Sequence, residues 1–524
     1  MTTATTVGRR ASAAGLALAA ALTASPALAA APSADRDRAA QKTGGGLDRY
    51  YRQHLAWGSC VTGPDDEVGR ELDKAGVQCA DVTVPLDYSN PRGRTITVAI
   101  SRLKATDTRN RIGAILLNNG GPGGTAVDSP PHVRKQMKDV GARYDIVGFD
   151  PRFVGRSTPL DCGWPVSIGL MSAGLDRTSF DGQVALNKSL AAKCRATDAS
   201  VLPHINTRNT ARDMDVIRGA LGERKISYLG YSYGTYLGTV FTQMFPDRVD
   251  RMVLDGAISP RRYGPLLMRD MVGPNERALA AWADWAAERN GTYGLGDTRE
   301  RVLGTVTTVL EEAGRRPLTL GTGEQTYRID DTHVPFIYFI GLATDKDEAR
   351  TALAEQTVIL KKAAEGRTAA LTPELTQILR LALTGDDSAT GSAQAAILCG
   401  DGYAPRNPET YWHDIERSRE KYPVFGPLTN NINPCAFWDK PRERPTEVRL
   451  DADPLIVSAT GDTRTPHDSA VELHRMLPSS KLLTLQGAIH HGTYGEYGND
   501  CVDTEVNRYL ATGRLPERDL TCTK

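Results

Sequence analysis

Residues Ile226-Ser-Tyr-Leu-Gly-Tyr-Ser-Tyr-Gly234 decide the fold, because they place the pattern Gly-x-Ser-x-Gly directly after a short apolar run. The run at 226–229 is predicted to be a strand, and 236–245 is predicted to be the helix behind it. A serine on a sharp turn between a strand and a helix holds its hydroxyl clear of the backbone, and the turn needs small residues beside it. This context indicates that Ser232 is a nucleophile.

Apolar runs on both sides of this stretch predict a sheet. The runs at 112–117 and 146–149 are continuous, which is typical of strands that are buried on both faces of a parallel sheet. The segments 81–88 and 95–101 alternate between apolar and polar residues and predict two antiparallel strands. Further strands are predicted at 251–254, 454–458 and 481–485. Because strands alternate with helical patterns, the fold class is α/β, with a mostly parallel sheet and flanking helices.

The alternation stops in the middle of the chain. From 257 to 449 the sequence is mostly helical in pattern, and strands resume only after it. We therefore predict a catalytic core formed by 47–256 plus 450–524, and a large helical cap insertion at 257–449.

A glycine-rich loop ends the strand at 112–117, with the sequence Asn118-Asn-Gly-Gly-Pro-Gly-Gly124. Glycines let a backbone approach a ligand closely. A loop in this place, upstream of the nucleophile, is where an oxyanion hole belongs. We expect an N–H group of Gly121, or of its neighbour Gly120, to act with the N–H group of Tyr233. No Gly-Lys-Ser/Thr follows, so the loop is not a phosphate-binding P-loop.

The nucleophile requires a base, and the base requires an acid that orients it. Asp462 follows the strand at 454–458, and His490 and His491 follow the strand at 481–485. Catalytic groups collect at the carboxyl ends of parallel strands. We favour His491 over His490 as the base, because Gly492 follows it directly. Asp255, at the end of another strand, is the rival for the acid.

Two polar pairs are expected to have local roles. Thr210 and Asp213 predict a start resembling a capping box for a helix at 210–221. Asp150 and Arg152 follow a strand and could brace the glycine-rich loop through a charge-assisted pair. A surface salt bridge is the alternative for the second pair.

The composition excludes several classes of function. The 524 residues include 63 Lys and Arg and 63 Asp and Glu, so the chain has no electrostatic footprint for nucleic acid. No Cys-x-x-Cys pair is present, which excludes zinc-ribbon and thioredoxin sites. We predict no metal site and no cofactor.

The N-terminus and the cysteines predict export. Residues 1–29 have the pattern of a signal peptide, with Arg9 and Arg10 before an apolar stretch and a small-residue cleavage site after Ala29. Residues 30–46 are predicted to be a flexible N-terminus or a short pro-segment, and no integral membrane segment is expected after removal of the signal. Eight cysteines in a secreted chain suggest disulfides. Pairing of sequence neighbours predicts Cys60–Cys79, Cys162–Cys194, Cys399–Cys435 and Cys501–Cys522.

Taken together, these motifs resemble the secreted actinobacterial tripeptidyl aminopeptidase family, which is related to the proline iminopeptidases of the α/β-hydrolase fold. The chain also looks like mycobacterial cell-envelope serine hydrolases first described as carboxylesterases. The resemblance implies Ser232 as nucleophile, His491 as base and Asp462 as acid, and the release of short peptides from free N-termini. The matching motifs are Asn119-Gly-Gly-Pro-Gly-Gly124, Asp150-Pro-Arg-x-x-Gly-Arg-Ser157, Gly230-Tyr-Ser-Tyr-Gly-Thr-Tyr236, Val253-Leu-Asp-Gly256, Cys399-x-Asp401, Cys435-x-x-Trp438, Gly461-Asp-x-x-Thr-Pro466 and His491-Gly492.

The expected function is therefore that of a secreted or cell-envelope serine exopeptidase acting on peptide or protein N-termini. An acid in the cap should pair with the substrate ammonium, because an unpaired charge in a closed pocket is costly. Asp401 is the residue that we name for this role. The alternatives are a carboxylesterase with the same triad and a non-catalytic surface binding protein. The cap is rich in charged residues, which disfavours a lipase lid.

Overall fold

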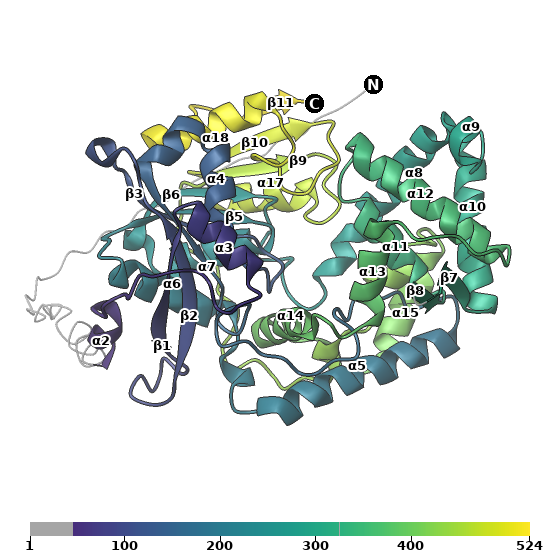
Figure 1. The fold of residues 1–524 in the computed structure, drawn as a ribbon, viewed down its shortest axis with the longest axis horizontal. Coiled ribbons are helices and arrows are strands. Elements are labelled where there is room, and N and C mark those ends of the chain that lie inside the picture. Colours follow the sequence, from purple (N-terminus) through teal and green to yellow (C-terminus); the bar gives the residue numbers. More distant parts are fainter. Residues whose placement is uncertain (1–45, 324) are drawn as a thin grey trace, which may run out of the picture. The chain divides into compact units, whose positions relative to one another are not determined.

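The computed structural model describes residues 46–323 and 325–524, which form a central sheet with helices on both faces and a helical cap (Figure 1). The predicted signal peptide, 1–29, and all but the last residue of the 30–46 segment lie outside the described residues. No helix in the described part is both long and apolar enough to cross a membrane.

In the described chain, nine strands form the central sheet in the order β1-β2-β4-β3-β5-β6-β9-β10-β11. β1 pairs antiparallel with β2, and β2 pairs antiparallel with β4, whereas all the other neighbours pair in parallel. This topology confirms the mostly parallel α/β sheet. The strands are β1 (Gln78–Pro85), β2 (Thr95–Leu103), β3 (Gly113–Asn118), β4 (Tyr144–Phe149), β5 (Ile226–Tyr231), β6 (Val249–Asp255), β9 (Leu455–Ala459), β10 (Lys481–Gln486) and β11 (Leu520–Thr523).

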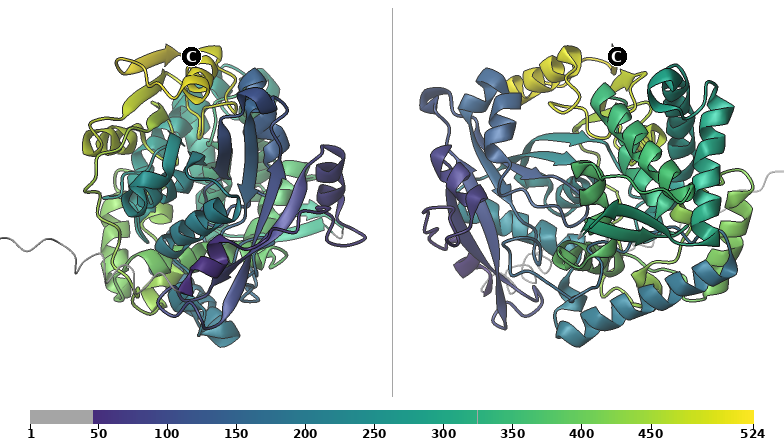
Figure 2. Two further views of the ribbon diagram at one scale, coloured as in Figure 1. Left: turned by 90° about the vertical axis from the view of Figure 1, so that its left-hand side faces the viewer. Right: turned by 45° about the vertical axis from the view of Figure 1, so that its right-hand side comes forward.

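Helices cover both faces of the sheet, which is why the residues of its central strands β3 and β9 are buried at every position. All six residues of β3 are buried, as are all five of β9. One face shares a core with α6 (Thr207–Ala220), α7 (Tyr233–Met244) and α17 (His467–Met476), and the other with α4 (Pro130–Gln136) and α18 (Asp500–Thr512). Figure 2 shows the twist of the sheet between these helices.

Residues 257–449, which we call the cap, are mostly helical and include one small hairpin, and their helices share a separate hydrophobic core. The elements of the cap are α8 (Val272–Ala287), α9 (Asn290–Tyr293), α10 (Arg299–Arg315), β7 (Leu318–Thr322), β8 (Gln325–Ile329), α11 (Val334–Gly341), α12 (Asp347–Ala364), α13 (Pro373–Leu383), α14 (Ser388–Asp401), α15 (Pro408–Arg419) and α16 (Gly426–Thr429).

The packing crosses the expected boundary at 257 in both directions. α5 (Arg177–Asp198) precedes the nucleophile in sequence, but its Phe180 packs with Tyr411 and Ile415 of the cap helix α15. Figure 1 shows α5 running beneath the cap helices. Conversely, α14 lies within the insertion but contributes to the same core cluster as the sheet strands β1 and β2. A helical pattern identifies an apolar face and leaves its packing partner open, so the sequence could not locate these contacts.

The predicted capping box at Thr210 is wrong. α6 begins one turn earlier, where the Asn206 side chain accepts the N–H group of Asn209. Asp213 lies inside the helix and forms a buried ion pair with Arg152, at 2.6 Å. Because Asp213 lies inside the helix and its carboxylate binds Arg152, it does not cap the helix.

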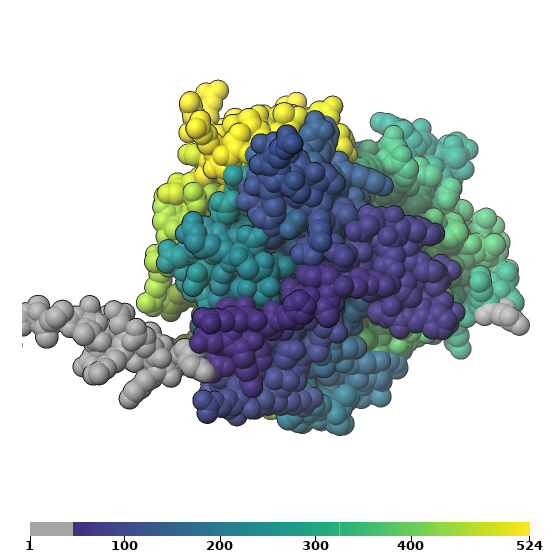
Figure 3. All heavy atoms as spheres, turned by 60° about the vertical axis from the view of Figure 1, so that its left-hand side comes forward, coloured from purple at the N-terminus to yellow at the C-terminus, as the bar shows by residue number. Residues whose placement is uncertain are grey.

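The four disulfides of the structure join sequence neighbours: Cys60–Cys79, Cys162–Cys194, Cys399–Cys435 and Cys501–Cys522. The first ties the segment before α3 (Glu67–Lys74) to β1, and the last ties α18 to β11. In the space-filling view, the N-terminal segment that contains the first disulfide (purple) covers the surface between the sheet-flanking helices (teal) and the cap (green) (Figure 3). The first and last bridges thus fasten peripheral segments to strands of the sheet.

Candidate active site

Ser232 lies at the turn between β5 and α7 in a strained conformation, with φ of 56° and ψ of −124°. The flanking glycines are required by close contacts. A Cβ at Gly230 would lie 2.6 Å from the Gly234 carbonyl oxygen, and a Cβ at Gly234 would lie 2.7 Å from the Asn118 carbonyl oxygen. The Ser232 backbone has the strained geometry of a nucleophile elbow.

Asp462 and His491 come together across the loops that follow β9 and β10. The Nδ1 atom of His491 lies 3.0 Å from Oδ2 and 3.1 Å from Oδ1 of Asp462. Asp462 is buried and also accepts the Thr465 hydroxyl at 2.7 Å and the Arg464 N–H group at 2.7 Å. Burial raises the pKa of the Asp462 carboxyl, but the His491 charge and these hydrogen bonds outweigh it, so the net pKa is lowered. Nε2 of His491 is left available, and His491 lines the same two cavities as Ser232.

His490 is directed away from Asp462. Its Nδ1 atom lies 2.7 Å from the Thr344 hydroxyl, and its ring packs on Tyr497. Burial and the Lys346 charge lower the pKa of His490 to about 4, which keeps the imidazole neutral. The structure therefore brings His491, and not His490, to Asp462.

Asp255, the rival acid, supports the loop that follows the base. Its carboxylate accepts the N–H groups of Thr493 and Tyr494, both at 2.7 Å. Its carbonyl oxygen accepts the N–H group of Ser232 at 2.9 Å. Burial raises the pKa of Asp255 to about 6, although the hydrogen bonds from Thr493 and Tyr494 act to lower it. Asp255 thus holds the backbone on both sides of the site, and it has no hydrogen bond to His491 in the described residues.

The glycine-rich loop lies against the nucleophile. A Cβ at Gly120 would lie 2.9 Å from the Ser232 Cβ and 3.1 Å from the Tyr233 nitrogen. The Gly120 N–H group is donated to the Asn118 side chain at 3.1 Å, which removes Gly120 as an oxyanion donor. The N–H groups of Gly121 and Tyr233 have no protein acceptor among the described residues. This leaves those two N–H groups as the pair that can bind a developing oxyanion.

Asp150 braces this loop, but not together with Arg152. Its carboxylate accepts the N–H groups of Ala126 and Val127, just after the glycines, and the N–H group of Arg156. The predicted Asp150–Arg152 pair is wrong, because the Arg152 guanidinium is bound to Asp213.

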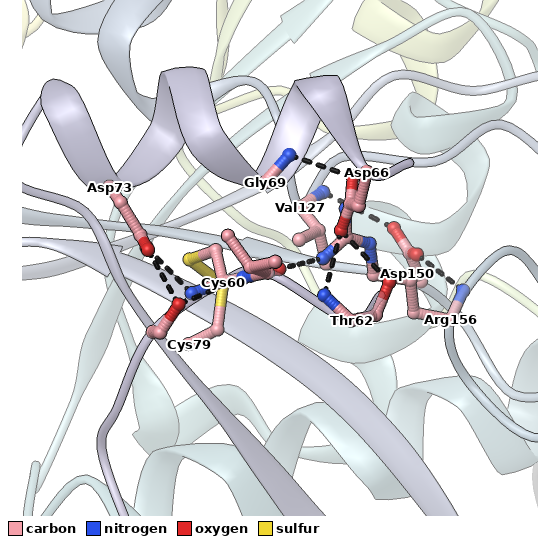
Figure 4. The surroundings of a disulfide bond; sticks show 11 residues. Cys60, Thr62, Asp66, Gly69, Asp73, Cys79, Val127, Asp150 and Arg156 are labelled. Atoms are coloured by element: carbon pink, nitrogen blue, oxygen red, sulfur yellow. Dashed lines mark hydrogen bonds and ion pairs between the residues drawn. A yellow bond between two sulfur atoms is a disulfide. The ribbon is translucent and has the colours of Figure 1, made fainter. Parts of the chain in front are cut away.

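Arg156 extends the brace to the first disulfide (Figure 4). Its guanidinium donates to the Cys60 carbonyl oxygen at 2.5 Å and to the Asp66 carboxylate at 3.1 Å. Arg156 stands in the Asp150-Pro-Arg-x-x-Gly-Arg-Ser157 motif, but its role was not predicted from the sequence.

A cavity of about 430 Å³ lies between the cap and the core and opens on Ser232. A cavity of this size fits a small ligand. Most of its lining is apolar, and no carboxylate side chain of residues 46–323 or 325–524 is part of it. Its charged or titratable members are Arg464 and His491. Other lining residues are Leu170, Met268, Met271, Phe336, Phe339, Ile340, Gln394 and Asn433.

Asp401 does not line this cavity, so the structure does not bring it to a substrate amine. It is buried at the end of α14, where its carboxylate accepts the N–H and hydroxyl groups of Thr207 and the hydroxyl of Tyr263. The Thr207 hydroxyl also lies 2.7 Å from the Tyr233 hydroxyl. Asp401 therefore connects the cap to the helix that begins beside Ser232, and its carboxylate already accepts three hydrogen bonds.

A second, more polar cavity of about 340 Å³ lies on the other side of the nucleophile and shares Asn119, Ser232 and His491 with the first. Glu496 lines it and pairs with His132 at 2.9 Å. Ser232 thus stands between an apolar chamber under the cap and a polar one outside it. Within the described residues, no group of three His, Cys, Asp or Glu side chains is placed to hold a metal ion.

Several known proteins and family models are similar to this chain. Residues 113–329 match a family model described as the alpha/beta hydrolase fold, and residues 422–522 match one described as TAP-like protein. The chain is 35% identical to a tripeptidyl aminopeptidase of Streptomyces lividans over 93% of its own length and 90% of that protein. It is 30% identical to the serine protease Hip1 of Mycobacterium tuberculosis, over 85% of this chain and 87% of that one. Carboxylesterase B of the same organism is also 30% identical, over 89% of each chain. A solved proline iminopeptidase of Mycobacterium smegmatis aligns with a TM-score of 0.38 and 13% identity, over 82% of this chain and 97% of that one.

Proposed function

The chain belongs to the tripeptidyl aminopeptidase family of α/β-hydrolases and is a serine peptidase, and on that premise we propose that it is a secreted exopeptidase that releases tripeptides from free N-termini. Ser232 is the nucleophile, His491 the base and Asp462 the acid. One observation carries the assignment. His491 pairs with Asp462 and lines the same two cavities as Ser232, whose backbone is strained.

The proposed mechanism proceeds through an acyl-enzyme. Nε2 of His491 takes the proton of the Ser232 hydroxyl as its oxygen attacks the scissile carbonyl. The N–H groups of Gly121 and Tyr233 bind the resulting oxyanion. The protonated His491 then gives its proton to the leaving amine, and the ester is hydrolysed by a water that His491 activates. Asp462 keeps Nδ1 protonated and stabilises the imidazolium.

The two cavities divide the substrate between them. The apolar chamber under the cap suits the short acyl part, because it is lined by residues of both the cap and the core. The polar chamber suits the leaving peptide, because several of its lining side chains are exposed. No carboxylate lines the acyl chamber, so the substrate ammonium is bound there by neutral acceptors such as the Gln394 side chain and backbone carbonyl groups.

Two observations support export. Residues 1–29 have a signal-peptide pattern, and four disulfides occur in the structure. Disulfides persist in oxidising compartments. Expression of the full chain in an actinobacterial host should yield extracellular protein that begins at Ala30. Protein that stays in the cytoplasm with residues 1–29 attached would contradict export.

The test of the activity uses three matched chromogenic substrates: Ala-Pro-Ala with a free amine, the same peptide N-acetylated, and a short-chain ester. We expect the free tripeptide to be cleaved with the highest kcat/KM, and this activity to be absent from Ser232→Ala. Equal cleavage of the acetylated peptide would indicate an endopeptidase. A preference for the ester would favour the carboxylesterase alternative. Failure of a serine-directed phosphonate to label the protein would favour a non-catalytic binding protein.

A further inference from the structure

Arg464 is a partly buried cation that lines the acyl chamber. It stands in the loop after β9, between Asp462 and Thr465, and lines the cavity together with Ser232 and His491. Its guanidinium lies over the Phe339 ring, 3.6 Å from the ring centroid. The side chain therefore lies in the chamber that the proposed function assigns to the acyl part of the substrate.

The partners of the guanidinium are all neutral. Nη1 donates to the Asn275 side chain at 3.0 Å and to the Thr463 hydroxyl at 2.9 Å, and Nη2 donates to the Phe339 carbonyl oxygen. Among the described residues, no carboxylate lies within ion-pair distance of it. The neighbouring Asp462 carboxylate is engaged by His491 and by its own loop. Burial lowers the pKa of Arg464 to about 9 against the opposing effect of the Asp462 charge, so the group is still cationic at neutral pH.

The site is built to hold this charge in one position. The Asn275 amide group donates to the Met271 and Thr463 carbonyl oxygens, each at 2.8 Å, which orients its own oxygen toward Arg464. Asn275 is fully buried in the cap helix α8. An unpaired charge in an apolar cavity is costly, and a fixed guanidinium is well suited to bind a carboxylate.

We propose that Arg464 is a specificity-determining residue that binds the carboxylate of an acidic side chain in the acyl part of the substrate. The proposal deepens the proposed function and rests on its assignment of the acyl part to this cavity. A substrate carboxylate supplies the negative charge that the cavity lining lacks. It can bind Arg464 without contacting Ser232, His491 or Asp462. The same charge repels the substrate ammonium, which must therefore bind elsewhere in the chamber. Peptides with Glu or Asp at one acyl position are thus the preferred class of substrate.

The test measures the rate at which peptidyl phosphonates inactivate Ser232. Three pairs of tripeptidyl probes carry Glu or its neutral isostere Gln at the first, second or third acyl position. For the wild-type protein we expect Glu to react roughly 10- to 100-fold faster than Gln at one position, the range expected for a charge-assisted hydrogen bond. Arg464→Gln should bring that ratio close to one, and Arg464→Lys should keep part of it.

Arg262→Gln is the matched control, because Arg262 also ties the cap to the core, through Glu472 at 2.7 Å, but does not line the cavity. It should leave the Glu-to-Gln ratio unchanged. A merely structural role of Arg464 would slow both probes of a pair equally and keep the ratio. The proposal is overturned if the wild-type ratio is close to one at all three positions, if it survives in Arg464→Gln, or if no probe labels Ser232.

The readout separates this proposal from the proposed exopeptidase activity. Each probe is made with a free and with an acetylated N-terminus. Equal reactivity of the two forms refutes the preference for free N-termini, while the Glu-to-Gln ratio still reports on Arg464 in either series.

Discussion

Asp462→Asn and Asp255→Asn should have very different effects on catalysis, although both residues are buried acids at strand ends. In Asp462, Oδ1 accepts the N–H groups of Arg464 and Thr465, at 2.7 and 2.9 Å. An asparagine oxygen in that position keeps the turn. Oδ2 accepts the Thr465 hydroxyl at 2.7 Å and faces Nδ1 of His491 at 3.0 Å. An amide NH₂ in its place forces Nδ1 to accept, so the ring carries its proton on Nε2 and cannot take one from the serine.

The expected loss follows from this change of tautomer. The corresponding change in a serine-protease triad lowers kcat by about 10⁴, which equals about 5.4 kcal/mol at 1.36 kcal/mol for each factor of ten. KM should change little, because Asp462 does not line the acyl cavity.

Asp255→Asn is the matched control, because its amide can replace every contact. An oxygen at the Oδ2 position still accepts the N–H groups of Thr493 and Tyr494, and the NH₂ group can donate to the Thr493 hydroxyl. We expect kcat to fall less than about tenfold, since only a charge is lost. Both kcat values are measured with a chromogenic tripeptide, after circular dichroism has shown that the variants are folded. Equal losses in the two variants, or a loss below tenfold in Asp462→Asn, would refute the assignment of the acid.

Single contacts elsewhere lead to three more expectations. Gly120→Ala should slow phosphonate labelling at least ~10²-fold, because an added Cβ would lie 2.5 Å from the Tyr231 carbonyl oxygen and the residue has φ of +89°; unchanged labelling would contradict this. Burial raises the pKa of Asp401 to about 6 from its ordinary 3.8. The folded protein therefore holds this proton more tightly, and Asp401 should lower the free energy of unfolding by about 3 kcal/mol as the pH rises from ~4 through ~6. Asp401→Asn should lack this component in urea unfolding, and identical pH profiles would count against it. Asp345→Ala should lower kcat about tenfold and change KM much less, because this cap carboxylate accepts the Ile489 N–H group in the loop that carries His491. An unchanged kcat would show that the contact does not position His491.

Much of the fold could be predicted from local patterns. The run at 112–117 and the alternation at 95–101 gave strands close to their observed bounds, since burial on two faces or one leaves a direct trace in sequence. The elbow was predictable because Gly230 and Gly234 meet steric demands that arise within a few residues.

The long-range partners of individual side chains were harder to predict from the sequence. Nothing local distinguishes an Asp213 that caps a helix from one that binds Arg152, 61 residues away. Asp401 was expected at a substrate amine because it lies in the cap, but its side chain points to Thr207 and Tyr263 instead. Arg464 and Thr465 stand in a motif that was identified, yet their contacts with the cap and the acid depend on how three loops meet.

The sequence by itself determined the α/β class and the family, and it pointed to the residues that we propose as nucleophile, base and acid, because strand burial, turn sterics and chain order are all written in short stretches of residues. Only the tertiary structure decided that His491 rather than His490 faces Asp462. It also decided that, among the described residues, Gly121 rather than Gly120 has a free N–H group, and that the cavity under the cap is lined by a guanidinium and by no carboxylate. Those outcomes depend on how separate loops meet in space. Two neighbouring residues of the same type, such as His490 and His491, differ only in the direction in which their side chains or N–H groups point, and the sequence does not record that direction.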